Sequence, residues 1–567
     1  MTNREQNTKR IVVIGGVAGG ASAATRARRM NEHAEIILLE KDGYVSFANC
    51  GLPYYIGGEI TDREKLLVAK PELLINRYNI DVRIYNKATA IDKNNKQITV
   101  ENTQDGNTYT LQYDQLILSP GARPIVPPID GVKTGNVYTL RNVEDTDQIK
   151  TYLDLNPNIK HITVVGAGFI GLEMVEQLHH LGIQVSLIEL QNQVLPLLDP
   201  DMAIMLEDEL VKNNIEVITG DGLRSIYNTD DKVSSVTLTS GKSIDTDMVL
   251  LGIGVTPNNE LAADADIAIG ERGGIKTDIA HRTSDRSIYA VGDVAEYIYG
   301  PTGQSMRVPL AGPANRAGRI AGTYAAANGH SPALEMSPVL GTSAVRLFNQ
   351  SAAMTGMSLK MAKNLDQHVS SVTVTANDHV GYYPGATPIT LKLVYIKDSG
   401  KILGAQAIGH KGVDKRIDVI ATLMHMKGTV RDMIGLDLVY APPFGAAKDI
   451  VHQAGFAATN ELDNLINVIQ PNEITDDMQV LDVRTMPERQ TTAIPNSVHI
   501  PVDNLREHLD DLDNTKTTAV VCGSGLRSYI AARILMQRGF VNVLNVSGGM
   551  SSWIRHQKAS RTQTIVS

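Results

Sequence analysis

The segments KRIVVIGGVAGGASAATRARRMNEHAEIILLE (residues 9–40) and KHITVVGAGFIGLEMVEQLHHLGIQVSLIE (residues 160–189) decide the fold of this chain. Each has the pattern of a buried strand, a glycine-rich turn, a helix of small residues and a second strand that ends in a carboxylate. In such a unit the amides at the helix N-terminus hold a pyrophosphate, and the carboxylate accepts hydrogen bonds from a ribose. The sequence therefore predicts two dinucleotide-binding domains in one polypeptide.

The turn of the first segment matches the G-x-G-x-x-G pattern at Gly15 and Gly20, whereas Val17 replaces the middle glycine. We expect a helix over residues 21–30 and a bound dinucleotide held by five residues: Gly15, Ala18, Gly19, Gly20 and Glu40. The alternative is a purely structural glycine turn. The strand, helix and acid all stand where a dinucleotide needs them, so binding is favoured.

Two further stretches predict that this first dinucleotide is FAD. The sequence SIYAVGD (residues 287–293) resembles the late FAD motif of flavoproteins with two dinucleotide sites. The resemblance implies that Gly292 and Asp293 belong to the FAD site and that Asp293 binds the flavin's ribityl chain. The sequence SPGA (residues 119–122), with Gly121, is similar to the motif where such chains leave the FAD domain.

The second segment matches the pattern completely through Gly166, Gly168 and Gly171, and we expect its helix over residues 172–181. Glu189 closes the second strand. A carboxylate at this position favours the 2'-hydroxyl of NADH and repels the 2'-phosphate of NADPH, and residues 190–192 include no arginine that would reverse this preference. The sequence therefore predicts NADH, with NADPH less favoured.

Length and composition indicate a large enzyme of several domains. At ~150 residues a domain, 567 residues predict about four domains. The formal charge of −9 argues against nucleic acid as a partner, and two cysteines cannot form a disulfide framework. No stretch reaches the ~18 apolar residues of a membrane span, and the polar start leaves no room for a signal peptide. We expect a cytoplasmic protein without a membrane segment, and we predict no metal site.

Periodicity and turns divide the chain into an α/β fold of four domains. We expect two Rossmann-like dinucleotide-binding domains, an α+β domain and a C-terminal α/β domain. The predicted bounds are 1–118 with 287–335 for FAD, 119–286 for NAD, 336–456 for the α+β domain, 457–471 for a linker and 472–567 for the C-terminal domain.

Cys50 is a candidate redox residue in the stretch SFANCGLP (residues 46–53), which lacks the C-x-x-C pair of dithiol reductases. One sulfur must then do the redox work. Such a thiol attacks as a thiolate and needs a lowered pKa, which a flavin face or a helix N-terminus could provide. The alternative is a buried structural cysteine.

The stretches GGVAGG (15–20), SFANCGLPY (46–54) and LAGPANR (310–316) make residues 10–455 resemble the coenzyme A disulfide reductases, single-cysteine members of the pyridine nucleotide-disulfide oxidoreductase group. The resemblance implies a mixed disulfide between Cys50 and coenzyme A, which FAD reduces after hydride transfer from NADH. It also implies that coenzyme A contacts five residues: Ser22, Arg26, Arg29, Ser46 and Asn49.

Arg26 and Arg29 are three residues apart on one helix face, where they could hold phosphates by charge-assisted hydrogen bonds. A solvated basic helix end is the alternative, and it suits Arg28 better. Tyr382 and Tyr440 fall in the segment that mediates dimerisation in the family. The resemblance implies a homodimer in which these hydroxyl groups reach the partner's active site, although they could also be ordinary core or interface tyrosines.

Cys522 follows a predicted strand in VVCGSGLRS (residues 520–528), and Arg527 closes its loop at the head of a helix. Successive amides in such a loop form an anion nest, so Cys522 should ionise readily and carry a persulfide. Together with LDVR (481–484), HIP (499–501) and GGM (548–550), this loop makes residues 472–553 resemble a rhodanese domain. Related phosphatases have a loop one residue longer, and an inactive rhodanese usually lacks the cysteine.

These observations lead to one mechanistic hypothesis and two rivals. Cys522 carries sulfane sulfur to coenzyme A, and Cys50 reduces the resulting persulfide, a polysulfide or coenzyme A disulfide with electrons from NADH. The rivals are an NADH peroxidase or oxidase that cycles Cys50 through a sulfenic acid, and a non-enzymatic flavin redox sensor. The order of preference among these sulfur substrates stays open, as does direct transfer of sulfur from Cys522 to Cys50.

Overall fold

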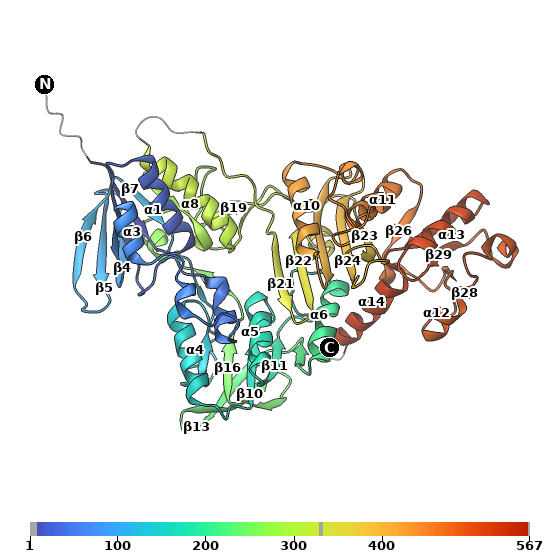
Figure 1. The fold of residues 1–567 in the computed structure, drawn as a ribbon, viewed down its shortest axis with the longest axis horizontal. Coiled ribbons are helices and arrows are strands. Elements are labelled where there is room, and N and C mark those ends of the chain that lie inside the picture. The colour runs from blue at the N-terminus through green and yellow to red at the C-terminus, as the bar shows by residue number, and fades with distance from the viewer. Residues whose placement is uncertain (1–7, 328–332, 565–567) are drawn as a thin grey trace.

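The computed structural model describes residues 8–327 and 333–564 (Figure 1). Residues 1–7, 328–332 and 565–567, which belong to the predicted FAD and C-terminal domains, lie outside the described residues. Four sheet-and-helix regions follow one another in space, from the blue N-terminal region to the red C-terminal region, and the predicted α/β fold class is confirmed. Within the described ranges, no helix is long and apolar enough to cross a membrane.

The first region contains a parallel sheet of order β18-β7-β1-β2-β3 with α1 and α8 packed together against it. Its central strands are almost completely buried, as expected for apolar strands covered on both faces. An antiparallel sheet, β4-β5-β6, extends it. The elements are β1 (Arg10–Ile14), α1 (Ala18–Met30), β2 (Glu35–Leu39), α3 (Pro71–Tyr78), β3 (Asp81–Arg83), β4 (Asn86–Asp92), β5 (Gln97–Asn102), β6 (Thr108–Gln112), β7 (Gln115–Leu118), β18 (Ile288–Ala290) and α8 (Ala311–Ala326).

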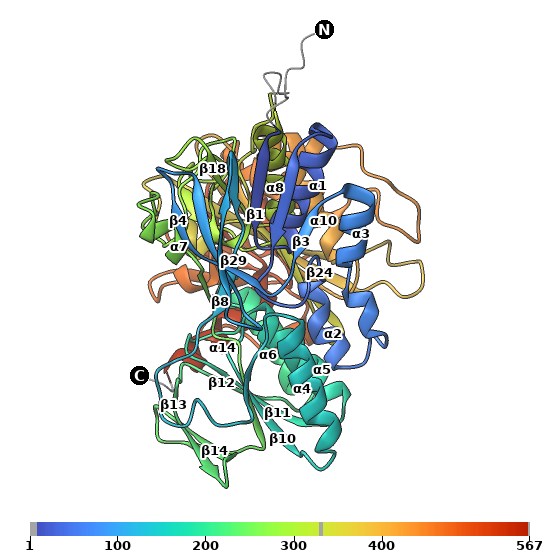
Figure 2. The same ribbon diagram turned by 90° about the vertical axis from the view of Figure 1, so that its left-hand side faces the viewer.

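The second region repeats this plan with a parallel sheet of order β12-β11-β10-β16-β9 and a small antiparallel sheet, β13-β14-β15. Figure 2 places it below the first region. Its elements are β9 (Val137–Thr139), α4 (Val143–Leu155), β10 (His161–Val165), α5 (Phe169–His180), β11 (Gln184–Glu189), α6 (Pro200–Lys212), β12 (Glu216–Thr219), β13 (Leu223–Thr229), β14 (Lys232–Leu238), β15 (Ser243–Asp245) and β16 (Met248–Leu251).

Short elements join or flank these two regions. They are η1 (Asn49–Gly51), α2 (Leu52–Ile56), η2 (Arg63–Leu66), β8 (Ala122–Pro124), β17 (Val255–Pro257), α7 (Glu260–Asp264), η3 (Gly292–Val294), β19 (Glu296–Ile298) and β20 (Ser305–Arg307). The helix α2 packs against α5, so the segment that carries Cys50 lies against the second dinucleotide unit.

Both dinucleotide helices begin three residues earlier than predicted: α1 starts at Ala18 and α5 at Phe169. The predictions placed each helix after the last glycine of its turn, because glycine disfavours helix interiors. In the structure Gly19, Gly20 and Gly171 belong to the first helical turn. The reason is close packing, since a side chain on Gly20 or Gly171 would collide with the backbone of the turn.

Glycines also allow α1 and α8 to cross in backbone contact. A Cβ atom on Gly318 would lie 2.2 Å from the carbonyl oxygen of Gly19, and one on Gly322 would lie 2.3 Å from that of Ala23. The two helices are therefore fixed side by side, and polar side chains from both meet at the rim of the crossing.

The third region is an antiparallel sheet of order β21-β22-β25-β24-β23 with helices packed against it. The elements are β21 (Ser343–Leu347), β22 (Gln350–Gly356), α9 (Leu359–Ala362), β23 (Val369–Asn377), β24 (Pro388–Ile396), β25 (Ile402–Gly409), α10 (Val413–His425), η4 (Asp432–Gly435) and α11 (Ile450–Leu462).

The fourth region is an all-parallel sheet of order β26-β30-β29-β27-β28. Its elements are β26 (Asn467–Ile469), η5 (Pro471–Glu473), β27 (Gln479–Asp482), α12 (Met486–Thr491), β28 (Val498–His499), η6 (Leu505–Glu507), η7 (Leu509–Asp511), β29 (Thr517–Val521), α13 (Leu526–Gln537), β30 (Asn542–Val546) and α14 (Gly549–Thr564).

The linker predicted at residues 457–471 is wrong. Helix α11 continues to Leu462, and residues 467–469 form β26, which pairs with β30. Only a short turn connects them. Polar composition was misleading here, because Thr459 and Glu461 of α11 are buried polar residues and β26 is a three-residue strand whose partner lies far along the chain.

The fourth region docks on the second and third. The backbone amide of Thr373 in β23 donates to the Ser547 hydroxyl (2.8 Å), and the Gln470 amide donates to the Ser371 carbonyl (3.1 Å). The helix α14 runs back to pack on α6, where Lys558 pairs with Asp208 at 2.9 Å (Figures 1 and 2).

A buried ion cluster lies where these three regions meet. Lys392 of β24 is only 1% exposed and pairs with Asp201 at 2.8 Å and Asp199 at 3.2 Å, both on or beside α6. The Gln406 amide donates to Asp199 (2.8 Å), and His556 of α14 approaches Asp201 at 3.7 Å. Residues of all three regions therefore contribute to this cluster.

Candidate active sites

The first glycine turn is shaped by its own packing. Gly15 has φ +93°, and a Cβ atom there would lie 2.0 Å from the Ser119 carbonyl oxygen. The buried carboxylate of Glu40 accepts hydrogen bonds from the Gly16 amide (2.8 Å) and the Asp42 amide (3.1 Å). Burial raises the pKa of Glu40, while these two hydrogen bonds oppose the shift. The acid is thus fixed at the turn, as a ribose site requires.

The glycines of the second turn differ in how closely the protein packs around them. A Cβ atom on Gly166 (φ +101°) or Gly171 would meet backbone at 2.4 Å or 1.9 Å, whereas one on Gly168 would meet nothing within 4 Å. Gly168 is the N-cap of α5, so the open space faces free helix amides. Glu189 accepts from the Ala167 amide at 2.7 Å. These residues fit a dinucleotide pyrophosphate and ribose.

Arg141 joins the late FAD motif to the exit turn, and sequence reasoning missed it. Its guanidinium donates to the Asp293 carboxylate (2.7 Å) and to the Ala122 carbonyl (3.0 Å), beside Gly121. The Gly292 amide donates to the Tyr297 hydroxyl at 3.0 Å. Arg141 precedes α4 without any motif, so only the tertiary structure reveals this contact.

Cys50 lies in η1, and the Asn49 side-chain amide donates to the Arg141 carbonyl at 3.2 Å. The residue is exposed, which contradicts the structural-cysteine alternative. The surrounding protein still removes part of the water near the thiol. This desolvation raises the pKa of Cys50, Glu173 and Asp293 raise it further, and Arg141 opposes them. The protein groups around the sulfur therefore do not supply the lowered pKa that we predicted.

Glu173 of α5 is a second residue that sequence reasoning missed. Burial raises its pKa to about 7, and the Tyr54 hydroxyl donates to it at 3.1 Å. It follows the second glycine turn directly, so one helix carries both a dinucleotide turn and a carboxyl group that acts on the Cys50 thiol.

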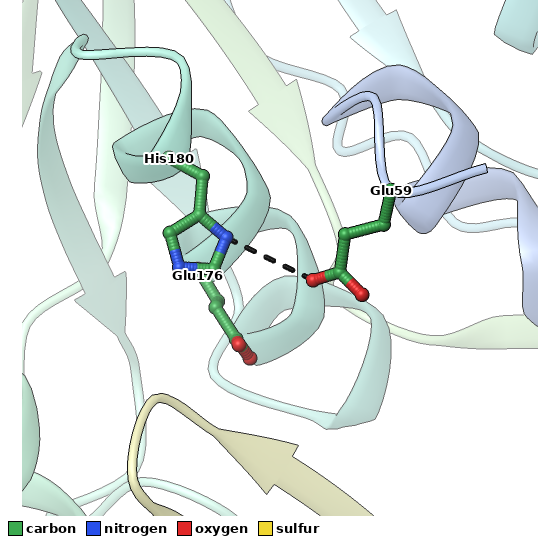
Figure 3. Close-up of side chains that lie close together, drawn as sticks. All are labelled: Glu59, Glu176 and His180. Carbon is green, nitrogen blue, oxygen red and sulfur yellow. Dashed lines mark ion pairs between the residues drawn. The ribbon is translucent and has the colours of Figure 1, made fainter. Parts of the chain in front are cut away.

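Near Glu173 there is a cluster of three titratable side chains that point toward one another: Glu59, Glu176 and His180 (Figure 3). Their possible ligand atoms lie within 4.8 Å of one another. His180 approaches Glu59 at 3.8 Å. The guanidinium of Arg346 pairs with both acids, at 3.0 Å from Glu176. Because this cation already compensates the two carboxylates, we read the cluster as an ion-pair network rather than a metal site.

The five predicted coenzyme A contacts lie on α1 and on the Cys50 segment. The Ser22 hydroxyl donates to the Asn315 side chain (2.5 Å), and the Arg26 guanidinium donates to the Thr323 hydroxyl (2.8 Å). Burial lowers the pKa of Arg26, and two nearby cations, Arg319 of α8 and Arg29, lower it further; Arg319 was missed from the sequence. Three arginines, Arg26, Arg29 and Arg319, therefore lie near the crossing of α1 and α8, and Arg29 is exposed.

Ser46 and Arg28 are both held by backbone hydrogen bonds. Ser46 adopts φ +47°, and its amide donates to the Gly16 carbonyl, so the Cys50 segment is anchored on the first turn. Arg28 is buried rather than solvated, which corrects the expectation. Its guanidinium donates to the carbonyl groups of Tyr78 (2.8 Å), Glu32 (2.6 Å) and Asn79 (2.7 Å).

Tyr382 and Tyr440 come together although 58 residues separate them. Their hydroxyl oxygens lie 3.1 Å apart, and the side chains are 75% and 45% exposed, respectively. They are therefore not core residues. Two neighbouring hydroxyl groups on an open surface of the third region are available to a second molecule.

Cys522 ends β29 and is almost fully buried. Its sulfur accepts hydrogen bonds from the Gly525 amide (3.1 Å) and the Ser528 hydroxyl (3.4 Å), as expected for a loop that holds a sulfur anion. Gly525 has φ +115°, which turns its amide toward the sulfur.

Arg527 does not extend freely over the loop. It forms two hydrogen bonds with the Glu488 carboxylate of α12, at 2.6 Å and 2.8 Å, and each partner shifts the other's pKa toward the charged form. Sequence reasoning missed Glu488, although T-x-x-E at residues 485–488 is a capping-box pattern and marks a helix start.

Three family models match the chain. The model of pyridine nucleotide-disulphide oxidoreductases matches residues 9–318, that of their dimerisation domain residues 342–451, and that of rhodanese-like domains residues 464–556. A coenzyme A disulfide reductase from Staphylococcus epidermidis is 35% identical over 456 residues, covering 79% of this chain and 99% of that protein.

Two solved structures match nearly the whole chain. Reduced Bacillus anthracis CoADR-RHD has a TM-score of 0.93 and 44% identity, covering 97% of this chain and 98% of its own. An NAD-dependent persulfide reductase from A. fulgidus has a TM-score of 0.88 and 37% identity, covering 96% and 100%. The predicted enzyme class, a flavin- and pyridine nucleotide-dependent oxidoreductase, is confirmed. The chain belongs to the pyridine nucleotide-disulphide oxidoreductase family and carries a rhodanese-like domain after the dimerisation domain.

Proposed function

We propose that this enzyme reduces coenzyme A persulfide, a polysulfide or coenzyme A disulfide with NADH through Cys50, while Cys522 carries sulfane sulfur. The observation that carries the proposal is the setting of Cys50. This lone thiol is exposed, and its neighbour Asn49 donates a hydrogen bond to Arg141, which pairs with Asp293 of the FAD motif. Burial raises the pKa of the thiol, and the charge of Glu173, on the second dinucleotide helix, raises it further. Its relatives named for coenzyme A disulfide and persulfide reduction support the choice of substrate.

FAD, when bound, would supply the two-electron relay between NADH and sulfur. We propose that eight residues hold it: Gly15, Ala18, Gly19, Gly20, Glu40, Gly121, Gly292 and Asp293. Gly166, Gly168, Gly171 and Glu189 would hold NADH in preference to NADPH. The Glu189 carboxylate and the open space at Gly168 support this assignment.

Cys50 carries out the reductive step in this proposal, and other residues position coenzyme A. The Cys50 thiolate attacks the inner sulfur of coenzyme A persulfide, a mixed disulfide forms, and sulfide leaves with the electrons of the broken S–S bond. Two electrons that originate from NADH then cleave the mixed disulfide to the Cys50 thiolate and free coenzyme A. We propose that Ser22, Arg26, Arg29, Ser46 and Asn49 position coenzyme A, and that Arg319 adds a further cation.

We propose a cytoplasmic homodimer in which the hydroxyl groups of Tyr382 and Tyr440 reach the partner's Cys50 site. Their mutual contact and exposure support this role, as does the match to a dimerisation domain. Apart from the corrected linker, we keep the predicted division into an FAD domain, an NAD domain, a dimerisation domain and a rhodanese domain as a proposal.

Stopped-flow assays with coenzyme A persulfide and NADH test the proposal. We expect Cys50→Ser to lower sulfide release at least about 100-fold, because the nucleophile is lost. Cys522→Ser is the matched control and should retain this step within about twofold. Unchanged sulfide release from Cys50→Ser would refute the proposal, and rapid peroxide consumption without any effect of coenzyme A would favour a peroxidase.

A further inference from the structure

Three arginines of the described part of the rhodanese-like domain, Arg484, Arg489 and Arg527, bind carboxylates near the Cys522 loop. Asp482 lies opposite Val521 in the pairing of β27 with β29, next to the catalytic loop. Arg484 binds Asp482 at 2.7 Å and also donates to the Glu488 and Thr492 carbonyls. Arg489 binds Asp482 at 3.4 Å and the Ser497 hydroxyl at 2.8 Å. The donors of these two arginines are directed into the protein.

Arg527 is the third cation and the one nearest the sulfur in sequence. Its two hydrogen bonds to Glu488 match the geometry of a bidentate guanidinium–carboxylate pair. Glu488 is itself held, because the Thr485 amide (3.0 Å) and hydroxyl (2.7 Å) donate to one of its oxygens. The charge of Arg527 is therefore neutralised by a carboxylate that cannot easily turn away.

The same two helices expose apolar side chains. Leu526, next to Arg527, is 70% exposed, and Ile530 lies one turn later on α13 with 42% exposed. Met486, two residues before Glu488 on α12, is 53% exposed. An uncharged organic arm would bury part of this apolar surface and gain free energy from it, whereas a small inorganic dianion would not.

We infer that Cys522 receives its sulfur from a persulfide on a larger thiol with an uncharged arm, and that the Glu488–Arg527 pair excludes small dianions such as thiosulfate. When a thiolate attacks thiosulfate and releases sulfite, three negative charges come together at the site. A free cation is needed to stabilise them. Attack on a persulfide gathers two negative charges, and the amides of the loop can stabilise them.

The transfer is redox-neutral at each step. The Cys522 thiolate attacks the outer sulfur of the donor persulfide, a Cys522 persulfide forms, and the donor thiolate leaves. A second thiolate then attacks the outer sulfur of the Cys522 persulfide and regenerates the Cys522 thiolate. The inference deepens the proposed function, because coenzyme A itself is a thiol of this class and is the acceptor proposed above.

Sulfur transfer by the full-length protein, with pantetheine persulfide or thiosulfate as donor, tests the inference. The wild-type protein should use pantetheine persulfide with a kcat/KM at least tenfold above that for thiosulfate. Glu488→Gln frees the Arg527 guanidinium and should raise kcat/KM for thiosulfate about tenfold, with less than threefold change for the persulfide. Glu507→Gln, an exposed glutamate in the same domain, is the matched control.

Two further variants make the outcome specific. In the double variant Glu488→Gln/Arg527→Gln the gain with thiosulfate should vanish, and Leu526→Ser should raise KM for pantetheine persulfide without changing that for thiosulfate. A wild-type protein that uses both donors equally, or an unchanged donor ratio in Glu488→Gln, would overturn the inference.

The assay is kept separate from the reductase reaction. Sulfur transfer is followed without NADH in the Cys50→Ser background, and loading of Cys522 is read as one added sulfur atom by mass spectrometry. Failure of the Cys50 proposal therefore leaves this readout unaffected, and failure of the donor inference leaves the Cys50 assay unaffected.

Discussion

Glu173 connects proton binding to the reactivity of Cys50. Its pKa of about 7 means that the carboxyl group is neutral below pH 7 and ionised above it, and only the ionised form raises the pKa of the thiol. We expect Glu173→Gln to accelerate alkylation of Cys50 about two- to fivefold at pH 8, the effect of a partly screened charge worth on the order of 0.5–1 kcal/mol. At pH 6 the rate should hardly change.

Iodoacetamide kinetics on the reduced holoenzyme, in a Cys522→Ser background, measure this effect. Glu72→Gln, which removes an exposed carboxylate on α3, is the control and should behave like the parent at both pH values. An equal acceleration at pH 6 and pH 8 would assign the effect to altered packing around Tyr54 instead of charge.

Single residues differ in how far the sequence reveals them. Cys50, Cys522 and the glycines of the turns stand in local motifs, because their roles depend on neighbours in the chain. Arg141 and Glu488 act across the fold, on partners 152 and 39 residues away. No local pattern specifies such a contact, so only the three-dimensional structure could identify it.

At the scale of helices, Gly318 and Gly168 form a matched pair of predictions. A Cβ atom on Gly318 would meet the backbone of α1 at 2.2 Å, so we expect Gly318→Ala to cost about 1–3 kcal/mol of stability and to weaken flavin retention. Gly168→Ala meets no protein atom. It should leave Tm within about 2 °C but raise KM for NADH about tenfold, because its methyl group occupies cofactor space.

Thermal unfolding, flavin absorbance after gel filtration and NADH kinetics check both variants. A normal melting temperature for Gly318→Ala would contradict the close crossing of α1 and α8, and normal NADH kinetics for Gly168→Ala would contradict the assigned turn. Sequence alone predicts that glycine is needed at both dinucleotide turns. It does not show that Gly166 is packed against backbone while Gly168 borders open space, since this depends on where Gly252 lies.

At the scale of the whole molecule, the buried cluster around Lys392 lies between three regions, with Lys392 from the third, Asp201 from the second and His556 from the fourth. Lys392→Met leaves Asp199 and Asp201 buried without their main counter-charge, so we expect a loss of about 3–5 kcal/mol and earlier proteolytic release of the rhodanese domain. Lys363→Met is the control. It breaks only an exposed pair with Glu473, which should cost at most about 1 kcal/mol.

Differential scanning calorimetry and limited proteolysis measure this effect. Equal stability of the two variants would mean that the buried cluster does not couple the regions. The sequence predicted the four domains because each has its own periodicity and turns. It could not predict how they dock, since Lys392, Asp201 and His556 come from three domains and nothing near any of them marks the contact.

The hydrogen bonds that Ser547 and Gln470 form with β23 have a practical consequence. β23 is the last strand of its sheet, and an uncovered edge strand invites pairing with strands of other molecules. A version truncated after α11 would uncover this edge and free Lys392's cluster from α14. We therefore expect such a truncated protein to aggregate more readily than the full-length chain, independently of any sulfur that the rhodanese domain carries.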